Sequence, residues 1–149
     1  MCIRDRVKYN GKTLKSGTDY TVSYSSNKNV GTATVKITGK GQYGGTVSKT
    51  FKINPAKQKI QKLTAKSKAF FIDWAQKGSA TGYEVQYATN SKFTGAKKLD
   101  VANNKTDKMT ISKLSANKKY YVKVRSYTLV KGTKYYGEWS AVKSVTTKK

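Results

Sequence analysis

Few side chains in this sequence could perform chemistry. The 149 residues contain no histidine, one cysteine and seven carboxylates. Histidine is the usual general base and the commonest metal ligand, and one cysteine cannot build a thiolate zinc site. A paired-carboxylate mechanism needs two neighbouring acids, but no motif surrounds any of the scattered acids Asp19, Asp73, Glu84, Asp100, Asp107 and Glu138. We therefore predict no catalytic residues, no metal site, no cofactor and no enzymatic activity.

One stretch has residue types suited to holding a ligand. Between residues 131 and 139 three aromatic side chains stand beside two lysines, and ring faces with cations suit sugars and acidic groups. The candidate ligand-binding residues are Lys131, Lys134, Tyr135 and Tyr136, with Tyr135 preferred if only one is exposed. The interpretation that we favour is structural: Trp139 and one tyrosine cover the end of a core, because large aromatics are usually buried.

A second group of charged residues has a simpler interpretation. Glu84, Lys123 and Arg125 fall on the outward positions of two segments that alternate in polarity. If those segments are neighbouring strands, the three side chains lie close together. We predict a cross-strand ion pair that contributes about 0.2–1 kcal/mol rather than a reactive site.

Residues 60–148 have the pattern of strands that would position these side chains. Apolar and polar residues alternate in short segments separated by turn residues, the period expected of half-buried strands. The apolar positions are Phe70, Ile72, Trp74, Tyr83, Val85, Tyr87, Leu99, Val101, Met109, Ile111, Tyr120, Val122, Val124, Val142 and Val145. About seven strands in roughly 90 residues is the size and rhythm of a β-sandwich.

The order of particular residues makes this segment resemble fibronectin type III domains. Trp74 stands where these domains have a core tryptophan, and residues 82–87, Gly-Tyr-Glu-Val-Gln-Tyr, look like their third strand. Leu114 and Tyr120 match the leucine and tyrosine-corner pattern, in which the tyrosine hydroxyl bonds to backbone upstream. Trp139-Ser140 looks like the pair that opens the last strand. The resemblance implies a core that contains Trp74, Tyr83, Val85, Leu114, Tyr120, Val122, Val124 and Trp139.

Residues 7–54 also alternate with period two and contain the hairpin signal Asn10-Gly11. They resemble an immunoglobulin-like repeat of large secreted proteins from Gram-positive gut bacteria, through Asn10-Gly11-Lys12, Asp19-Tyr20, the turn at 27–31, Gly39–Gly41 and Phe51-Lys52-Ile53. A further strand or two usually precedes these features in such repeats. We therefore expect a partial immunoglobulin-like domain, followed by a short linker at 55–59 around Pro55. The fold class is all-β, with tandem immunoglobulin-like sandwiches of which the first is incomplete.

The first six residues have no continuity with this pattern. They lack the apolar core of a signal peptide, and they look like the in-frame translation of a sequencing adapter. We expect residues 1–6 to be foreign to the natural protein, so that Cys2 does not belong to it and a secretion signal has been lost with the natural N-terminus.

The charge of the chain limits the possible partners. Its 31 lysines and arginines against seven acids give a formal net charge of +24, and such a field favours polyanions at low salt. No nucleic-acid recognition motif and no membrane-spanning apolar run is present. The expected partners are anionic cell-wall polymers, glycans or a host surface protein, bound by a monomeric part of a longer extracellular chain.

These observations favour a non-catalytic structural or adhesive module at the C-terminal end of a larger secreted or cell-surface bacterial protein. One alternative is an accessory module, a spacer or a carbohydrate-binding unit, of an extracellular hydrolase with its catalytic domain upstream. Another is a small basic protein that binds nucleic acid or another polyanion, which requires Met1 to be genuine.

Overall fold

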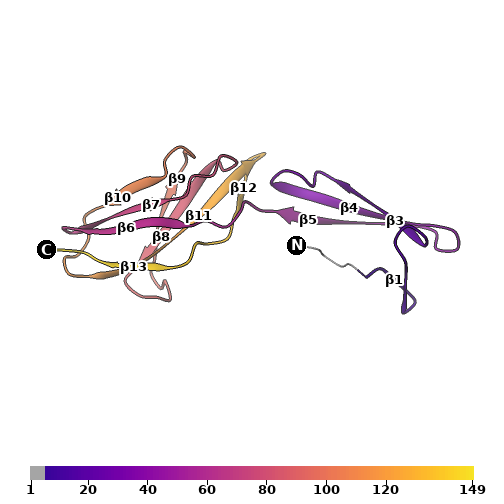
Figure 1. The fold of residues 1–149 in the computed structure, drawn as a ribbon, viewed down its shortest axis with the longest axis horizontal. Coiled ribbons are helices and arrows are strands. Elements are labelled where there is room, and N and C mark those ends of the chain that lie inside the picture. The colour runs from indigo at the N-terminus through magenta and orange to yellow at the C-terminus, as the bar shows by residue number, and fades with distance from the viewer. Residues whose placement is uncertain (1–5) are drawn as a thin grey trace. The chain divides into compact units, whose positions relative to one another are not determined.

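The computed structural model describes residues 6–149, so the expectation about residues 1–6 falls, apart from Arg6, outside the described residues. The chain divides into two compact units, Met1–Ile53 and Asn54–Lys149. Every regular element of the described residues is a β-strand (Figure 1). The all-β fold class is therefore confirmed.

The first unit is built from a small hairpin and one antiparallel sheet. Strands β1 (Lys8–Tyr9) and β2 (Lys12–Thr13) are joined at Asn10 and Gly11, whose φ angles of 47° and 79° suit a tight hairpin turn. The sheet has the order β3-β4-β5, with β3 at Tyr20–Ser25, β4 at Gly31–Gly39 and β5 at Thr46–Ile53. The predicted hairpin is thus confirmed.

The two faces of this sheet differ sharply in composition. The register places all the apolar strand residues on one face, together with Lys49, whereas every strand residue of the other face is Ser, Thr or Lys. The apolar face contains Tyr20, Val22, Tyr24, Ala33, Val35, Ile37, Val47, Phe51 and Ile53. Tyr24 and Val47 are each 56% exposed, so the face is only partly covered by the described residues.

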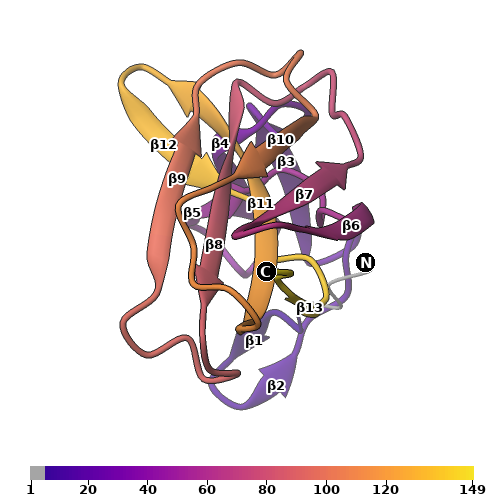
Figure 2. The same cartoon turned by 90° about the vertical axis from the view of Figure 1, so that its left-hand side faces the viewer.

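The second unit is a sandwich of two antiparallel sheets. One sheet has the order β10-β7-β6, with β6 at Ile60–Lys66, β7 at Ala69–Trp74 and β10 at Lys108–Ile111. The other has the order β12-β11-β8-β9, with β8 at Gly82–Ala88, β9 at Lys97–Val101, β11 at Lys119–Val130 and β12 at Thr133–Tyr136. A last strand, β13 (Lys143–Thr146), also pairs with β11. Figure 2 shows the strands of the two sheets as separate layers.

The core lies between these sheets, on the inward positions of their strands. Trp74, Tyr83, Val85, Val122 and Val124 have no exposed surface. Leu114 and Tyr120 belong to the same buried cluster. Rings stack within it, with centroids 5.5 Å apart for Trp74 and Tyr83, a spacing at which edge-to-face contacts are favourable.

The expected tyrosine corner is present. The hydroxyl of Tyr120 accepts a hydrogen bond of 3.2 Å from the backbone N–H of Ser115. Leu114, just before that amide, is packed into the core. The bond ties the segment that enters β11 to the loop upstream of it, as the sequence pattern predicts.

The second unit has eight strands where about seven are expected, because the last strand is interrupted. Both β12 and β13 pair with the same side of β11, and residues 137–142 between them have no strand assignment. The break is held by Ser140, whose N–H donates to the carbonyl of Val124 at 2.8 Å and whose hydroxyl accepts from the N–H of Val124 at 3.1 Å. Trp139-Ser140 therefore lies in the interruption and does not open the final strand.

Residues 55–59, expected as a linker, pack onto the second unit instead. Pro55 and Gln58 are buried, and the hydroxyl of Ser126 donates to the carbonyl of Ala56 at 3.3 Å. The N–H of Gln58 donates to the carbonyl of Glu138 at 3.4 Å. These contacts make the segment a part of the sandwich, so the boundary between the units is at residues 53–54.

Candidate functional site

The β11–β12 hairpin carries the four residues expected to bind a ligand. Its turn is Lys131-Gly132, with φ angles of 47° and 78°, a conformation that glycine adopts without strain. Lys131 is exposed at this turn. The register of the hairpin pairs Tyr136 with Tyr127 and Lys134 with Leu129, so Lys134 and Tyr136 share one face of the sheet.

The four candidate residues do not converge on a common site. Tyr135 pairs with Thr128, and the alternation of β12 directs it to the opposite face from its neighbours. Lys134 forms an ion pair with Asp100 and lies 4.1 Å from the ring centroid of Tyr127. Tyr136 lies 3.7 Å from the guanidinium carbon of Arg125. Contacts within the domain therefore already engage Lys134 and Tyr136.

The outer face of the β12-β11-β8-β9 sheet holds a continuous stack of cations and rings, which we call the cation–aromatic ladder. Lys123 Nζ lies 4.0 Å from the ring centroid of Phe93 and 4.7 Å from that of Trp139. Arg125 follows, 4.4 Å from the Trp139 ring and 3.7 Å from that of Tyr136. Tyr127 and Lys134 complete it. The ladder consists of Phe93, Lys123, Trp139, Arg125, Tyr136, Tyr127 and Lys134.

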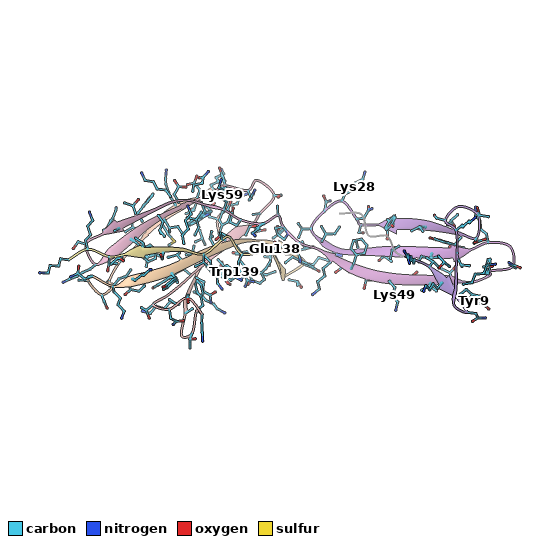
Figure 3. All side chains as sticks on the ribbon, turned by 60° about the horizontal axis from the view of Figure 1, so that its bottom comes forward. Tyr9, Lys28, Lys49, Lys59, Glu138 and Trp139 are labelled. Atoms are coloured by element: carbon cyan, nitrogen blue, oxygen red, sulfur yellow. The ribbon has the colours of Figure 1, made fainter. Side chains whose placement is uncertain are left out.

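Trp139 is the expected core residue that the structure places elsewhere. It is half-buried and lies outside the buried cluster between the sheets. The reason is local: Ser140 is directed inward to bond Val124, so the preceding side chain lies over Lys123 and Arg125 instead. Figure 3 labels Trp139 and Glu138 in the segment between β12 and β13.

The predicted cross-strand ion pair is confirmed for Arg125 and Glu84. Their side chains are bonded at 2.9 Å and are 22% and 13% exposed. Arg125 Nε is buried and has no hydrogen-bond partner among residues 6–149, which fits a guanidinium held partly by ring faces. Lys123, in contrast, contacts the rings of Phe93 and Trp139 rather than Glu84. Burial lowers the pKa of Lys123, and the nearby charge of Arg125 lowers it further.

Tyr127, Asp100 and Lys134 form a small polar cluster at one end of the ladder. Tyr127 is buried because it lies across Gly82, where a Cβ atom would be 2.7 Å from its hydroxyl oxygen. Desolvation raises the pKa of Tyr127, and Asp100 raises it further. Partial burial disfavours the Asp100 carboxylate, but hydrogen bonds from Lys134 and Tyr127 outweigh this and lower the pKa of Asp100. Hydrogen bonding to Asp100 raises the pKa of Lys134.

The cations and aromatic rings of this face can bind charged groups and flat ring surfaces. No group of three or more potential metal ligands occurs within residues 6–149. None of the described residues forms a helix of the length and apolar character needed to span a membrane. Sequence reasoning omitted Phe93 and Tyr127 from this face. Alternation along β11 could have placed Tyr127 with Lys123 and Arg125, whereas Phe93 lies in a loop with no such signal.

Comparison with known proteins identifies the second unit. The fibronectin type III domain family matches residues 54–146. The fold is similar to that of the chicken CNTN1 FN1–FN3 domains, with a TM-score of 0.56 and 18% identity over 83% of this chain and 45% of that one. It is also similar to a myokine structure, with a TM-score of 0.53 and 12% identity over 64% of this chain and 100% of that one. At these identities the structures show the fold alone. No curated protein sequence matches the chain.

Proposed function

Since the chain belongs to the fibronectin type III domain family through residues 54–146, we propose that it is a spacing and adhesion module of a larger secreted or cell-surface bacterial protein. Fibronectin type III domains are a generally non-catalytic module type that commonly mediates binding. The ligands that we propose are anionic cell-wall polymers or acidic glycans. The module holds them through its surface charge and presents them on a rigid sandwich.

The observation that carries this proposal is the uncompensated positive charge. The sequence has 31 cationic side chains against seven acids, and the described residues contain two ion pairs, Arg125–Glu84 and Lys134–Asp100. Most lysines are therefore available to a polyanion. Because the ladder engages its own cations with rings, we assign binding to the exposed lysines outside it.

The test is the binding of poly(glycerol phosphate) to the whole chain as a function of NaCl. Counterion release predicts that affinity falls by at least about tenfold between about 50 and 200 mM salt. Neutral dextran serves as the control polymer and should not bind. Affinity that does not change with salt, or equal affinity for dextran, would contradict binding through surface charge.

We also propose that the first unit is one sheet of an immunoglobulin-like sandwich. The division of its sheet into a largely apolar and a wholly polar face supports this, because such a division is typical of a sheet with one buried face. The similarity to the FN1–FN3 domains covers 83% of the chain, which is more than residues 54–149 alone make up. Hydrogen exchange tests the proposal: amides of β4 should exchange much faster than those of β8. Equal protection of the two strands would show that the sheet is stable without a second layer.

A further inference from the structure

A groove runs along one side of the second unit, where the edges of its two sheets approach each other. Strand β6 is the edge of one sheet, and β13 pairs only with β11 in the other. At one end the edges are joined by Lys148, whose N–H donates to the carbonyl of Lys66 at 2.9 Å. At the other end the N–H of Gln58 donates to the carbonyl of Glu138. Between them lies an opening of about 420 Å³.

The lining of this groove combines an apolar floor with a cationic rim. Its six residues are Lys57, Gln58, Lys59, Ile60, Ala141 and Lys143. All three lysines are exposed, and none of the six is acidic. Lys59 is labelled in Figure 3. The groove is separate from the cation–aromatic ladder and shares no residue with it.

Gln58 provides a second observation. Its side chain is only 2% exposed, and its Oε1 accepts a hydrogen bond of 2.9 Å from the N–H of Lys59. This bond fixes Nε2 as the opposite end of the amide, and Nε2 has no hydrogen-bond partner in the part of the chain that the structure describes. A buried amide without an acceptor is costly, and Gln58 lines the groove, so a bound acceptor would remove that cost once the side chain turns outward.

These features select the kind of ligand. Lysines at the rim attract carboxylates, and a small apolar floor suits aliphatic side chains. The two neighbouring strand edges suit an extended chain, which can pair with a free edge. Sugars, in contrast, favour aromatic faces, and no aromatic ring lines the groove.

We propose that this groove binds an extended polypeptide segment in which carboxylates alternate with aliphatic residues. The carboxylates contact Lys57, Lys59 and Lys143, and the aliphatic side chains lie against Ile60 and Ala141. This site goes beyond the charge-based binding of polymers proposed above, because it requires a defined place on the domain.

The experiment measures the fluorescence anisotropy of a short labelled peptide in which Glu and Val alternate, titrated with the whole chain at about 0.15 M salt. The first variant replaces three rim lysines together, Lys57→Gln, Lys59→Gln and Lys143→Gln. We expect the dissociation constant to rise by about tenfold or more, since three charge contacts are lost.

A matched control removes the same charge elsewhere. It carries Lys92→Gln, Lys105→Gln and Lys108→Gln, three exposed positions outside the groove, and should change the dissociation constant by less than about twofold. A second groove variant, Ala141→Trp, leaves the charge unchanged and obstructs the floor at an exposed residue. It should weaken peptide binding about as much as the rim variant, and circular dichroism verifies that each variant is folded.

Three outcomes would overturn the proposal. The first is that the peptide does not bind. The second is that both triple variants weaken peptide binding equally, which would make the binding non-specific. The third is that a heparin oligosaccharide displaces the peptide and loses its own binding only in the groove variants, which would assign the groove to a polysaccharide. None of these results depends on salt-sensitive binding of poly(glycerol phosphate), so the proposed function is tested separately.

Discussion

Replacing Arg125 by glutamine should destabilise the second unit more than the replacement of any exposed lysine does. The guanidinium is bonded to Glu84 at 2.9 Å in a partly buried setting and contacts the rings of Trp139 and Tyr136. Two cation–π contacts at about 0.5–1 kcal/mol each and one charge-assisted hydrogen bond at about 1.5–3 kcal/mol give an upper range of about 2.5–5 kcal/mol. Because one group makes all three contacts, their energies are not additive, and we predict a loss of about 2–3 kcal/mol.

The assay is urea denaturation followed by tryptophan fluorescence. Both tryptophans, Trp74 and Trp139, lie in the second unit, so the signal reports that unit. Lys118→Gln is the matched control, since its side chain is exposed, and it should change the free energy of unfolding by less than about 0.5 kcal/mol. Arg125→Lys keeps the charge but loses the planar stacking group, so it should fall between the two.

A loss below about 0.5 kcal/mol for Arg125→Gln, similar to that of the control, would contradict a stabilising role of these contacts. The outer face would then be an ordinary solvated surface, on which such pairs contribute little.

Three further predictions concern other parts of the chain. Tyr120→Phe removes the bond to the N–H of Ser115 and should lower the free energy of unfolding by about 1–2 kcal/mol in the same urea assay. The lowered pKa of Asp100 means that its contribution to stability is present above the unfolded value of about 4 and is lost as the pH falls through the folded value. Stability measured between about pH 5 and pH 2 should therefore fall less steeply in Asp100→Asn, and an unchanged slope would contradict the cause given for the shift. Phe51 lies on the partly exposed apolar face of the first unit, so Phe51→Ser should reduce the binding of a hydrophobic dye such as ANS. Undiminished dye binding would show that this face is not the source of the ANS fluorescence.

The sandwich could be predicted from the sequence because its signals are local and repeated. Alternation placed Trp74, Tyr83 and Val122 on core positions, and the spacing from Leu114 to Tyr120 identified the corner. The hairpin at Asn10-Gly11 followed from the backbone preferences of those two residues. Each of these features depends on neighbours in the chain.

The features that the sequence did not predict depend on contacts between distant residues. Trp139 was expected in the core because its type is usually buried, but the inward hydrogen bond of Ser140 directs it to the outer face. Residues 55–59 were expected as a linker from a single proline, whereas their bonds to Ser126 and Glu138 are long-range. Phe93 joins the ladder from a loop, and loops carry no periodic signal.

The most direct test of the proposed function is a two-dimensional ¹⁵N NMR titration of the whole chain with poly(glycerol phosphate). We expect small shifts at amides of exposed lysines in both units, reversed by added salt, with little change at the indole N–H of Trp139. Saturable shifts centred on Trp139 and Tyr136 that persist in high salt would contradict binding through surface charge, because they would show a specific aromatic site at residues that contact Lys123 and Arg125 within the domain.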